Sequence, residues 1–110
     1  MISDFKHKNL AAGRWFTLSL TEQMGNIGSE VWRASRARQG KDEERFWGAV
    51  ERALELFDFT IDDPRWSGRL REIARAREVF CDAVYGGQLY KSSFEDLIRY
   101  FDLFAYVARK

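Results

Sequence analysis

The residues best placed to do chemistry are acidic side chains spread between positions 44 and 62. They recur at spacings of 7, 4, 3 and 4, which places them on one face of a predicted helix as an acidic ridge: Glu44, Glu51, Glu55, Asp58 and Asp62. Clustered carboxylates are suitable ligands for Mg²⁺. A hydrolase of the all-α type needs carboxylate pairs on two helices, and only one such helix occurs here. Both a magnesium site and an ordinary solvated helix face therefore stay open.

The other side chains with catalytic or metal-binding potential are isolated. His7 is the only histidine and has no sequence neighbour that would fix it as a base or ligand. Cys81, the only cysteine, lies among apolar residues, which is typical of a small core residue. The sequence contains no Glu-x-x-His pair, Cys-x-x-Cys pair, P-loop or dinucleotide-binding motif. It therefore predicts no catalytic residue, no metal ligand and no cofactor, and favours a protein that is not an enzyme.

Arginines on two predicted helices form a second candidate site. Arg33 and Arg36 on one helix, and Arg71 and Arg75 on another, are possible nucleic-acid contacts, since arginine pairs well with phosphate. Alternatively, the second pair is neutralised by acidic residues of its own helix: Glu72, Glu78 and Asp82. Arg77 lies within an apolar stripe, where an unpaired charge is costly. We expect it to form an ion pair with another helix or another subunit.

Length and composition indicate one small domain. The chain has 110 residues, of which 15% are aromatic, including nine Phe, four Trp and four Tyr. This aromatic content is large for so small an interior, so part of it is expected to cover a subunit interface. The net charge of +1 excludes a strongly basic protein. One cysteine, no apolar leader and no run of about 18 apolar residues predict a cytoplasmic protein without a membrane segment.

Helical spacing dominates the chain, and strand-like alternation is nearly absent. Helix-start signals occur at Ser19, Asp42 and Pro64 and again at Ser92-Ser93-Phe94-Glu95. Short connections favour antiparallel neighbours. We therefore expect an all-α, up-down four-helix bundle in a single domain, 1–110, with an N-terminal arm or extra helical turn at 1–18 and helices at 19–39, 42–61, 64–85 and 93–108.

The apolar stripes on the middle helices are broad. On the second helix, the stripe that starts at Phe46 is widened by Trp47, Leu54 and Ile61 to about half the circumference. On the third, the residues expected to face inward are Leu70, Ile73, Ala74, Phe80, Cys81 and Val84.

Two features point to contact with another macromolecule. Gly25 and Gly28 leave a flat surface on the first helix, where another backbone could approach closely. Trp32 lies beside them, either as an interface anchor or as a partly exposed side chain that covers the N-terminal segment. The last helix is apolar over more than half its circumference and must be covered on two sides. Its second apolar face is the expected interface, formed by Tyr100, Leu103 and Val107.

Residues 19–59 resemble a known group of small four-helix proteins. These are encoded in intervening sequences of bacterial 23S ribosomal RNA genes, together with the related accessory protein of diversity-generating retroelements. The shared order is a Leu-x-x-Gln start, small residues, a Glu and an Arg, and an Ala-Leu-Glu helix: here Leu20, Gln23, Glu30, Arg33, Ala53, Leu54 and Glu55. The chain departs from the group where GNIGSEVWR replaces a Ser-x-x-x-Asn-x-x-Glu-Gly run. It also looks similar to short prokaryotic proteins that contain LAAGRWF and SLTEQ-type segments.

That resemblance implies a ring-shaped homo-oligomer that associates with nucleic acid and a reverse transcriptase. The residues themselves favour a non-enzymatic, self-associating helical bundle that acts as an adaptor or scaffold, and Leu103→Glu is expected to dissociate it. One alternative is a nucleic-acid-binding accessory protein that uses the Arg-rich face. The other is a Mg-dependent hydrolase that uses the acidic ridge.

Overall fold

The chain folds into helices joined by short turns. The computed structural model describes residues 13–87 and 93–108, and in the last helix it describes side chains only as far as Phe104. The described residues are helical and contain no β-strand, which confirms the all-α prediction. The elements are α2 (Leu20–Gln39), α3 (Glu43–Asp62), the 3₁₀ segment η1 (Pro64–Arg69), α4 (Leu70–Val84) and α5 (Phe94–Ala108).

Local hydrogen bonds begin the first two long helices where the sequence predicts. The Ser19 hydroxyl accepts a hydrogen bond from the Glu22 backbone N–H at 3.1 Å, and the Glu22 carboxylate accepts one from the Ser19 N–H at 2.9 Å. Asp42 caps α3 by accepting a hydrogen bond from the Arg45 N–H at 3.1 Å. Between the helices, Lys41 adopts a left-handed φ of 57°, which closes the short turn.

The third predicted helix begins later than expected. Pro64–Arg69 forms a 3₁₀ segment in which Trp66 has non-helical angles (φ −104°, ψ 20°), and the regular helix begins at Leu70. Pro is compatible with the first helical position, as expected. However, Arg65 donates a hydrogen bond to the Leu18 carbonyl, and the Trp66 indole donates one to Gln23 of α2. These tertiary contacts hold the segment in the tighter form.

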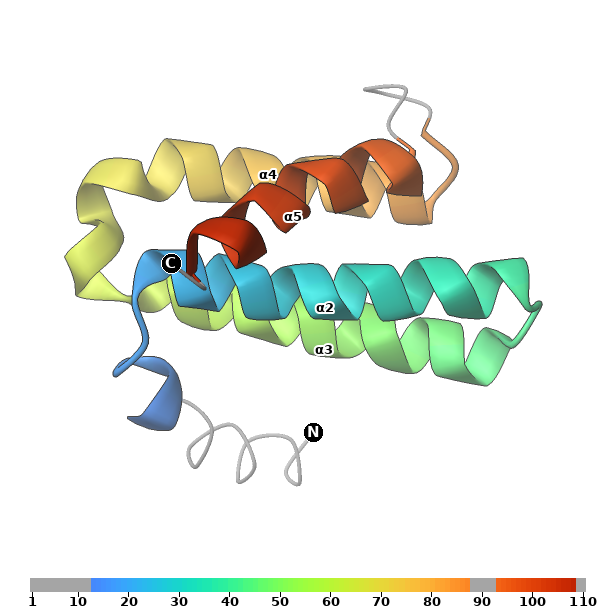
Figure 1. Ribbon diagram of the computed structural model, residues 1–110, viewed down its shortest axis with the longest axis horizontal. Helices are drawn as coiled ribbons and strands as arrows, with labels where there is room; N and C mark the ends of the chain where they lie inside the picture. Colours follow the sequence, from blue (N-terminus) through green and yellow to red (C-terminus); the bar gives the residue numbers. More distant parts are fainter. Residues whose placement is uncertain (1–12, 88–92, 109–110) are drawn as a thin grey trace.

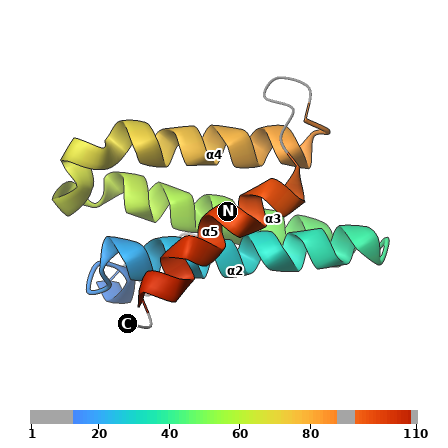
Figure 2. The ribbon, with the colours of Figure 1, turned by 45° about the horizontal axis from the view of Figure 1, so that its top comes forward.

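The helices form a bundle built on one antiparallel pair. α2 and α3 lie side by side, α4 packs on α3, and α5 packs on α2 (Figure 1). The order of α2, α3 and α4 is up-down, as predicted. Figure 2 shows that α5 instead runs obliquely across α2.

Buried aromatic rings from three helices meet in the core. The Phe57 ring centroid lies 6.0 Å from that of Phe80 and 6.1 Å from that of Phe101. Gly28 allows α5 to cross α2 at this point, because a Cβ on Gly28 would lie 2.6 Å from the Phe101 Cβ. The small-residue surface predicted on α2 is therefore used, at Gly28, by another helix of the same chain.

The N-terminal segment is tied to α3. Residues 13–15 are helical, Trp15 is buried, and its indole donates a hydrogen bond to the Thr60 hydroxyl at 3.0 Å. The rest of the predicted arm, residues 1–12, lies outside the described residues. Across 13–87 and 93–108, no helix is long and apolar enough to span a membrane.

Candidate functional site

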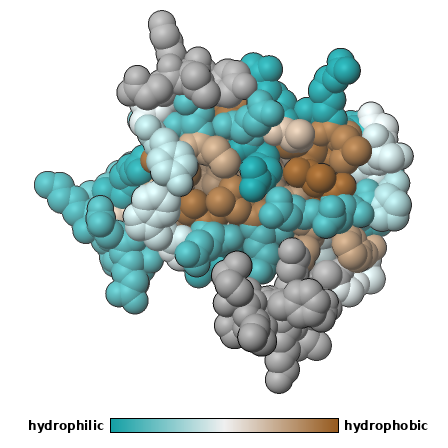
Figure 3. Space-filling model, turned by 180° about the vertical axis from the view of Figure 1, so that it is seen from behind, coloured by the Kyte–Doolittle hydropathy of each residue, from teal (hydrophilic) through white to brown (hydrophobic). Residues whose placement is uncertain are grey.

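A broad apolar surface lies on the side of the molecule away from α5, where α3 and α4 run next to each other. Seen from behind, hydrophobic residues gather across this side, and hydrophilic residues interrupt them near the middle (Figure 3). We call this surface the α3/α4 face. It consists of half-buried or exposed side chains around a central ion pair: Trp47, Leu54, Ile61, Leu70, Ala74, Cys81 and Tyr85, with Asp58 and Arg77 in the centre.

Two contacts establish how the helices line up in this face. The Trp47 and Tyr85 ring centroids lie 6.1 Å apart at one end. In the middle, Arg77 Nε lies 3.2 Å from Asp58 Oδ1. Side chains seven residues apart share one side of a helix, so Leu54 follows Trp47 along the flank of α3 that borders α4. Trp47 is 39% exposed and Tyr85 is 72% exposed, so aromatic surface is open to solvent at that end.

Three residues of α4 that were expected to face the core lie on this surface instead. Leu70 is 38% exposed, and Ala74 and Cys81 are half-buried. The other three are buried as predicted: Ile73, Phe80 and Val84. The apolar stripe of α4 is wider than the contact that neighbouring helices make with it, so its edge stays outside the core. Burial raises the pKa of the Cys81 thiol, which makes it a poor nucleophile at neutral pH.

Arg77 forms an ion pair between helices of the same chain. The sequence predicted that its partner would lie on another helix or on another subunit. In the structure the partner is Asp58 of α3. Arg77 Nε is buried and makes no aligned hydrogen bond, so the contact is electrostatic. Both side chains are partly exposed, so the pair contributes only about 0–1 kcal/mol.

The acidic ridge forms the outer rim of this face on the α3 side. Glu44, Glu51 and Asp62 are exposed and Glu55 is half-buried. None of these four forms an ion pair with a residue that the structure describes, whereas Asp58 is engaged in the central pair. Within the described residues, no group of three or more His, Cys, Asp or Glu side chains is placed to hold a metal ion. The ridge is thus an anionic rim, without the second helix of carboxylates that the hydrolase hypothesis needs.

Glu30 links α2 to α3 from a buried position. Its carboxylate lies 2.9 Å from Arg33 Nη1 on its own helix and 3.2 Å from Arg52 Nε on α3. Glu30 is 9% exposed, and the two arginines supply the charge that an isolated buried carboxylate would lack. Glu30 and Arg33, which belong to the motif of the family resemblance, therefore have a packing role within the chain.

The four arginines proposed for nucleic acid do not form one patch. Arg33 is engaged by Glu30, and Arg36 lies over the Trp32 ring at 5.2 Å. Arg71 and Arg75 are exposed on α4, which packs on α3 rather than on α2. The two pairs therefore lie on separate parts of the bundle.

The residues predicted as an interface lie on two helices that pack on each other, α2 and α5. Trp32 on α2 is 49% exposed and Leu103 on α5 is 66% exposed. Tyr100 is instead half-buried, with its ring packed edge-on against Phe101 at 5.2 Å, and burial raises its pKa. The side chain of Val107 lies outside the described residues.

Trp32 borders a cleft of about 320 Å³ between α2 and α5, whose other lining residues are Gly25, Gly28, Ser29, Arg33, Phe101 and Asp102. Its lining combines small residues with the polar side chains of Arg33 and Asp102. Leu103 follows Asp102 in the chain and is not among the residues that line this cleft.

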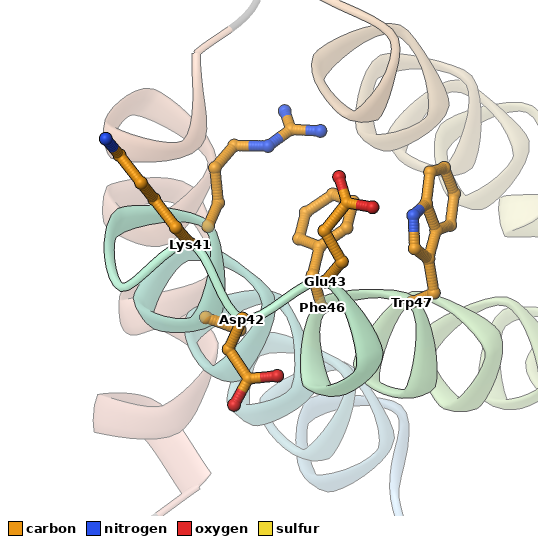
Figure 4. A pocket seen from close by; sticks show the side chains of 7 residues that line it. Lys41, Asp42, Glu43, Phe46 and Trp47 are labelled. Carbon is orange, nitrogen blue, oxygen red and sulfur yellow. The ribbon is translucent and has the colours of Figure 1, made fainter.

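A second cleft, of about 340 Å³, lies at the turn between α2 and α3. Figure 4 shows Glu43 and Phe46 on one side of α3 and the Asp42 side chain turned away. The Arg38 guanidinium lies 4.1 Å from the Phe46 ring centroid and donates a hydrogen bond to the Val84 carbonyl at 2.8 Å. Arg38 therefore satisfies the carbonyl end of α4 and is not available to an anionic ligand.

Buried Gln23 is the centre of a polar network that the sequence did not predict. Its amide donates hydrogen bonds to the Trp15 carbonyl at 2.9 Å and to Asp63 Oδ2 at 3.1 Å, and accepts one from the Trp66 indole at 2.9 Å. Arg65 lies 2.7 Å from Asp63, and this hydrogen-bonded partner lowers the pKa of Asp63. The network therefore joins the N-terminal segment, α2 and η1 through groups that satisfy one another.

The chain matches no known family model, no curated protein and no solved structure. Function must therefore be argued from the geometry of the described residues.

By its exposed hydrophobic side chains, the α3/α4 face is the strongest candidate for a functional surface. Six large hydrophobic side chains are exposed in the described part of the chain, and three of them lie on this face: Trp47, Leu70 and Tyr85. Part of the face had a sequence signal, because the stripe widened by Trp47, Leu54 and Ile61 was too broad for one helix contact. No sequence signal indicated Tyr85, because it follows the last residue of α4. Only the packing of the helices shows that its ring lies against Trp47.

Proposed function

We propose that this chain is a non-enzymatic, self-associating helical bundle that acts as a scaffold or adaptor. The observation that carries the proposal is the α3/α4 face, an apolar surface that the chain's own described helices leave open. The largest exposed apolar patch of a protein is often an interaction site. Trp and Tyr, which lie together at one end of this face, are also the residues most enriched at the centres of interfaces.

The structure of the rim supports the same proposal. Apolar side chains occupy the middle of the face and charged side chains, chiefly the acidic ridge, lie along its edge. Protein interfaces have this organisation of an apolar centre and a polar rim. The one charged pair inside the face, Asp58 and Arg77, is already neutralised within the chain.

The test is the molar mass in solution, measured by light scattering behind a sizing column at several protein concentrations and at low and moderate salt. We expect the average molar mass to rise above 12.9 kDa as the protein concentration increases. It should change little between low and moderate salt, because the contact is mainly apolar. A mass of 12.9 kDa at every concentration, up to the millimolar range, would refute self-association.

A further inference from the structure

We propose that two copies of this chain pair face to face through the α3/α4 face, about a two-fold axis that runs parallel to α3 and α4. Each α3 then lies over α4 of the partner subunit. This inference rests on the proposed self-association and adds its geometry. Two-fold pairing is the commonest symmetry of homo-oligomers, and it requires a surface that is complementary to itself.

Two directions of the two-fold axis keep the helices of the two subunits aligned when such faces meet. An axis parallel to the helices places α3 over α4 of the partner. An axis perpendicular to the helices, within the plane of contact, places α3 over α3 and α4 over α4. The charges at the rims distinguish the two arrangements.

The α3 rim is acidic and the α4 rim carries arginine. On the α3 rim, four carboxylates have no ion-pair partner among the described residues: Glu44, Glu51, Glu55 and Asp62. On the α4 rim, Arg71 is exposed and likewise forms no ion pair with a described residue, and Arg75 lies one turn further on. The perpendicular axis would bring acidic rim against acidic rim. The parallel axis brings each acidic rim over Arg71 of the partner subunit.

The attraction is concentrated at one end of the face. α3 ends at Asp62 and α4 begins at Leu70, so Asp62 and Arg71 lie at the same end of the face but on opposite rims. A parallel axis keeps like ends together, and therefore places Asp62 over the partner subunit's arginine-bearing rim. Glu78 also lies on the α4 rim and weakens the complementarity nearer the middle.

The size of the face predicts a weak, concentration-dependent dimer. α4 has 15 residues and is about 22 Å long. With helix axes about 8–10 Å apart, a two-helix face is about 20 Å wide, or roughly 400 Å² in projection. Stable interfaces bury about 800 Å² of accessible surface per partner. We therefore expect a dissociation constant in about the micromolar range.

The experiment compares three full-length chains by sedimentation equilibrium: the unchanged protein, Leu54→Glu and Leu103→Glu. Leu54 lies within the α3/α4 face, and Leu103 is exposed on α5 and serves as the matched control. Leu54→Glu should raise the dimer dissociation constant about 50-fold or more, through lost apolar burial and a desolvated charge. Leu103→Glu, expected from the sequence alone to dissociate the oligomer, should leave this dimer unchanged, because Leu103 lies on α5 and outside the α3/α4 face. Circular dichroism of each variant confirms that the helices persist.

Charge reversal tests the axis with variants that do not touch the apolar surface. Asp62→Arg and Arg71→Glu should each raise the dissociation constant about 3- to 10-fold at low salt, since the contact occurs twice in the dimer. The double variant, which exchanges the two signs, should restore the dissociation constant.

The outcomes separate the two proposals. A monomeric unchanged protein overturns both. A dimer lost with Leu103→Glu but kept with Leu54→Glu overturns the α3/α4 pairing and leaves self-association standing. A dimer that Leu54→Glu dissociates but Asp62→Arg strengthens overturns the parallel axis, because relief of acidic repulsion marks α3 over α3.

Discussion

Replacing Gly28 with Ala should destabilise this protein, although the same change stabilises most helices. Ala is favoured over Gly in a helix interior by about 1 kcal/mol. At Gly28 the added Cβ would lie 2.6 Å from the Cβ and 3.2 Å from the Cγ of Phe101. Since the Cβ of Phe101 is fixed to the backbone of α5, rotation of the side chain cannot relieve this contact, and α5 must move.

The magnitude follows from the two opposing terms. Overpacking a filled site costs about 1–3 kcal/mol, and a separation as short as 2.6 Å places this contact in the upper part of that range. After the propensity gain of about 1 kcal/mol, the net loss in the free energy of unfolding is about 1–2 kcal/mol. A chain of this length should then unfold at a temperature lower by about 5–15 °C.

Gly48 provides the matched control. It lies inside α3, where an added Cβ would meet only the end of the flexible Arg52 side chain, at 3.5 Å. Gly48→Ala should therefore raise the free energy of unfolding by up to about 1 kcal/mol. Urea denaturation followed by circular dichroism measures both variants at one low protein concentration. If Gly28→Ala proved as stabilising as Gly48→Ala, the inferred contact between α2 and α5 would be wrong.

Two further predictions concern the network at the η1 end of the bundle. Gln23→Leu keeps the side chain's size but leaves the Trp66 indole and the Trp15 carbonyl without their partner, and should lower the free energy of unfolding by about 2–4 kcal/mol in urea titrations; a loss below about 0.5 kcal/mol would argue against the network. The pKa of Asp63 is lowered in the fold by its hydrogen bond to Arg65, so its contribution is complete above the unfolded pKa of about 4 and is lost as pH falls through the lower folded pKa. Thermal unfolding between pH 7 and pH 2 should show this loss and a flatter profile for Asp63→Asn, whereas identical pH profiles would show that Asp63 is not the titrating group.

Local signals in the sequence were sufficient to place most helix boundaries. The capping box at Ser19 and the cap at Asp42 form as predicted, because both involve backbone and side-chain groups within three residues of each other. The predicted end of this helix at residue 39 is also confirmed, and Gly40 caps it by donating its N–H to the Arg36 carbonyl. The start of α4 was wrong by six residues because the hydrogen bonds that hold η1 come from residues far away in the chain.

The residues of the candidate site were predictable only where their arrangement depends on the spacing within a single helix. The acidic ridge and the broad stripe of α3 depend on the 3.6-residue period and follow from spacing alone. The partner of Arg77 depends on how α3 and α4 align, and only the fold shows that it is Asp58. Tyr100 was predicted to be covered by another subunit because its helix is apolar on two sides. In the structure it is half-buried, and its ring packs edge-on against Phe101 of its own helix.

The sequence by itself determined that the described part of this protein is all-helical, where α2 and α3 begin and which helix faces are apolar, since these properties arise from interactions within a few residues. Tertiary structure decided which apolar faces cover one another. Gln23 is buried at the centre of a network, Gly28 marks a helix crossing, and the edges of the α3 and α4 stripes remain open. Burial depends on where distant segments meet. The sequence of an apolar stripe is the same whether the stripe is covered by its own chain or by a second copy, so the sequence alone does not identify the cover.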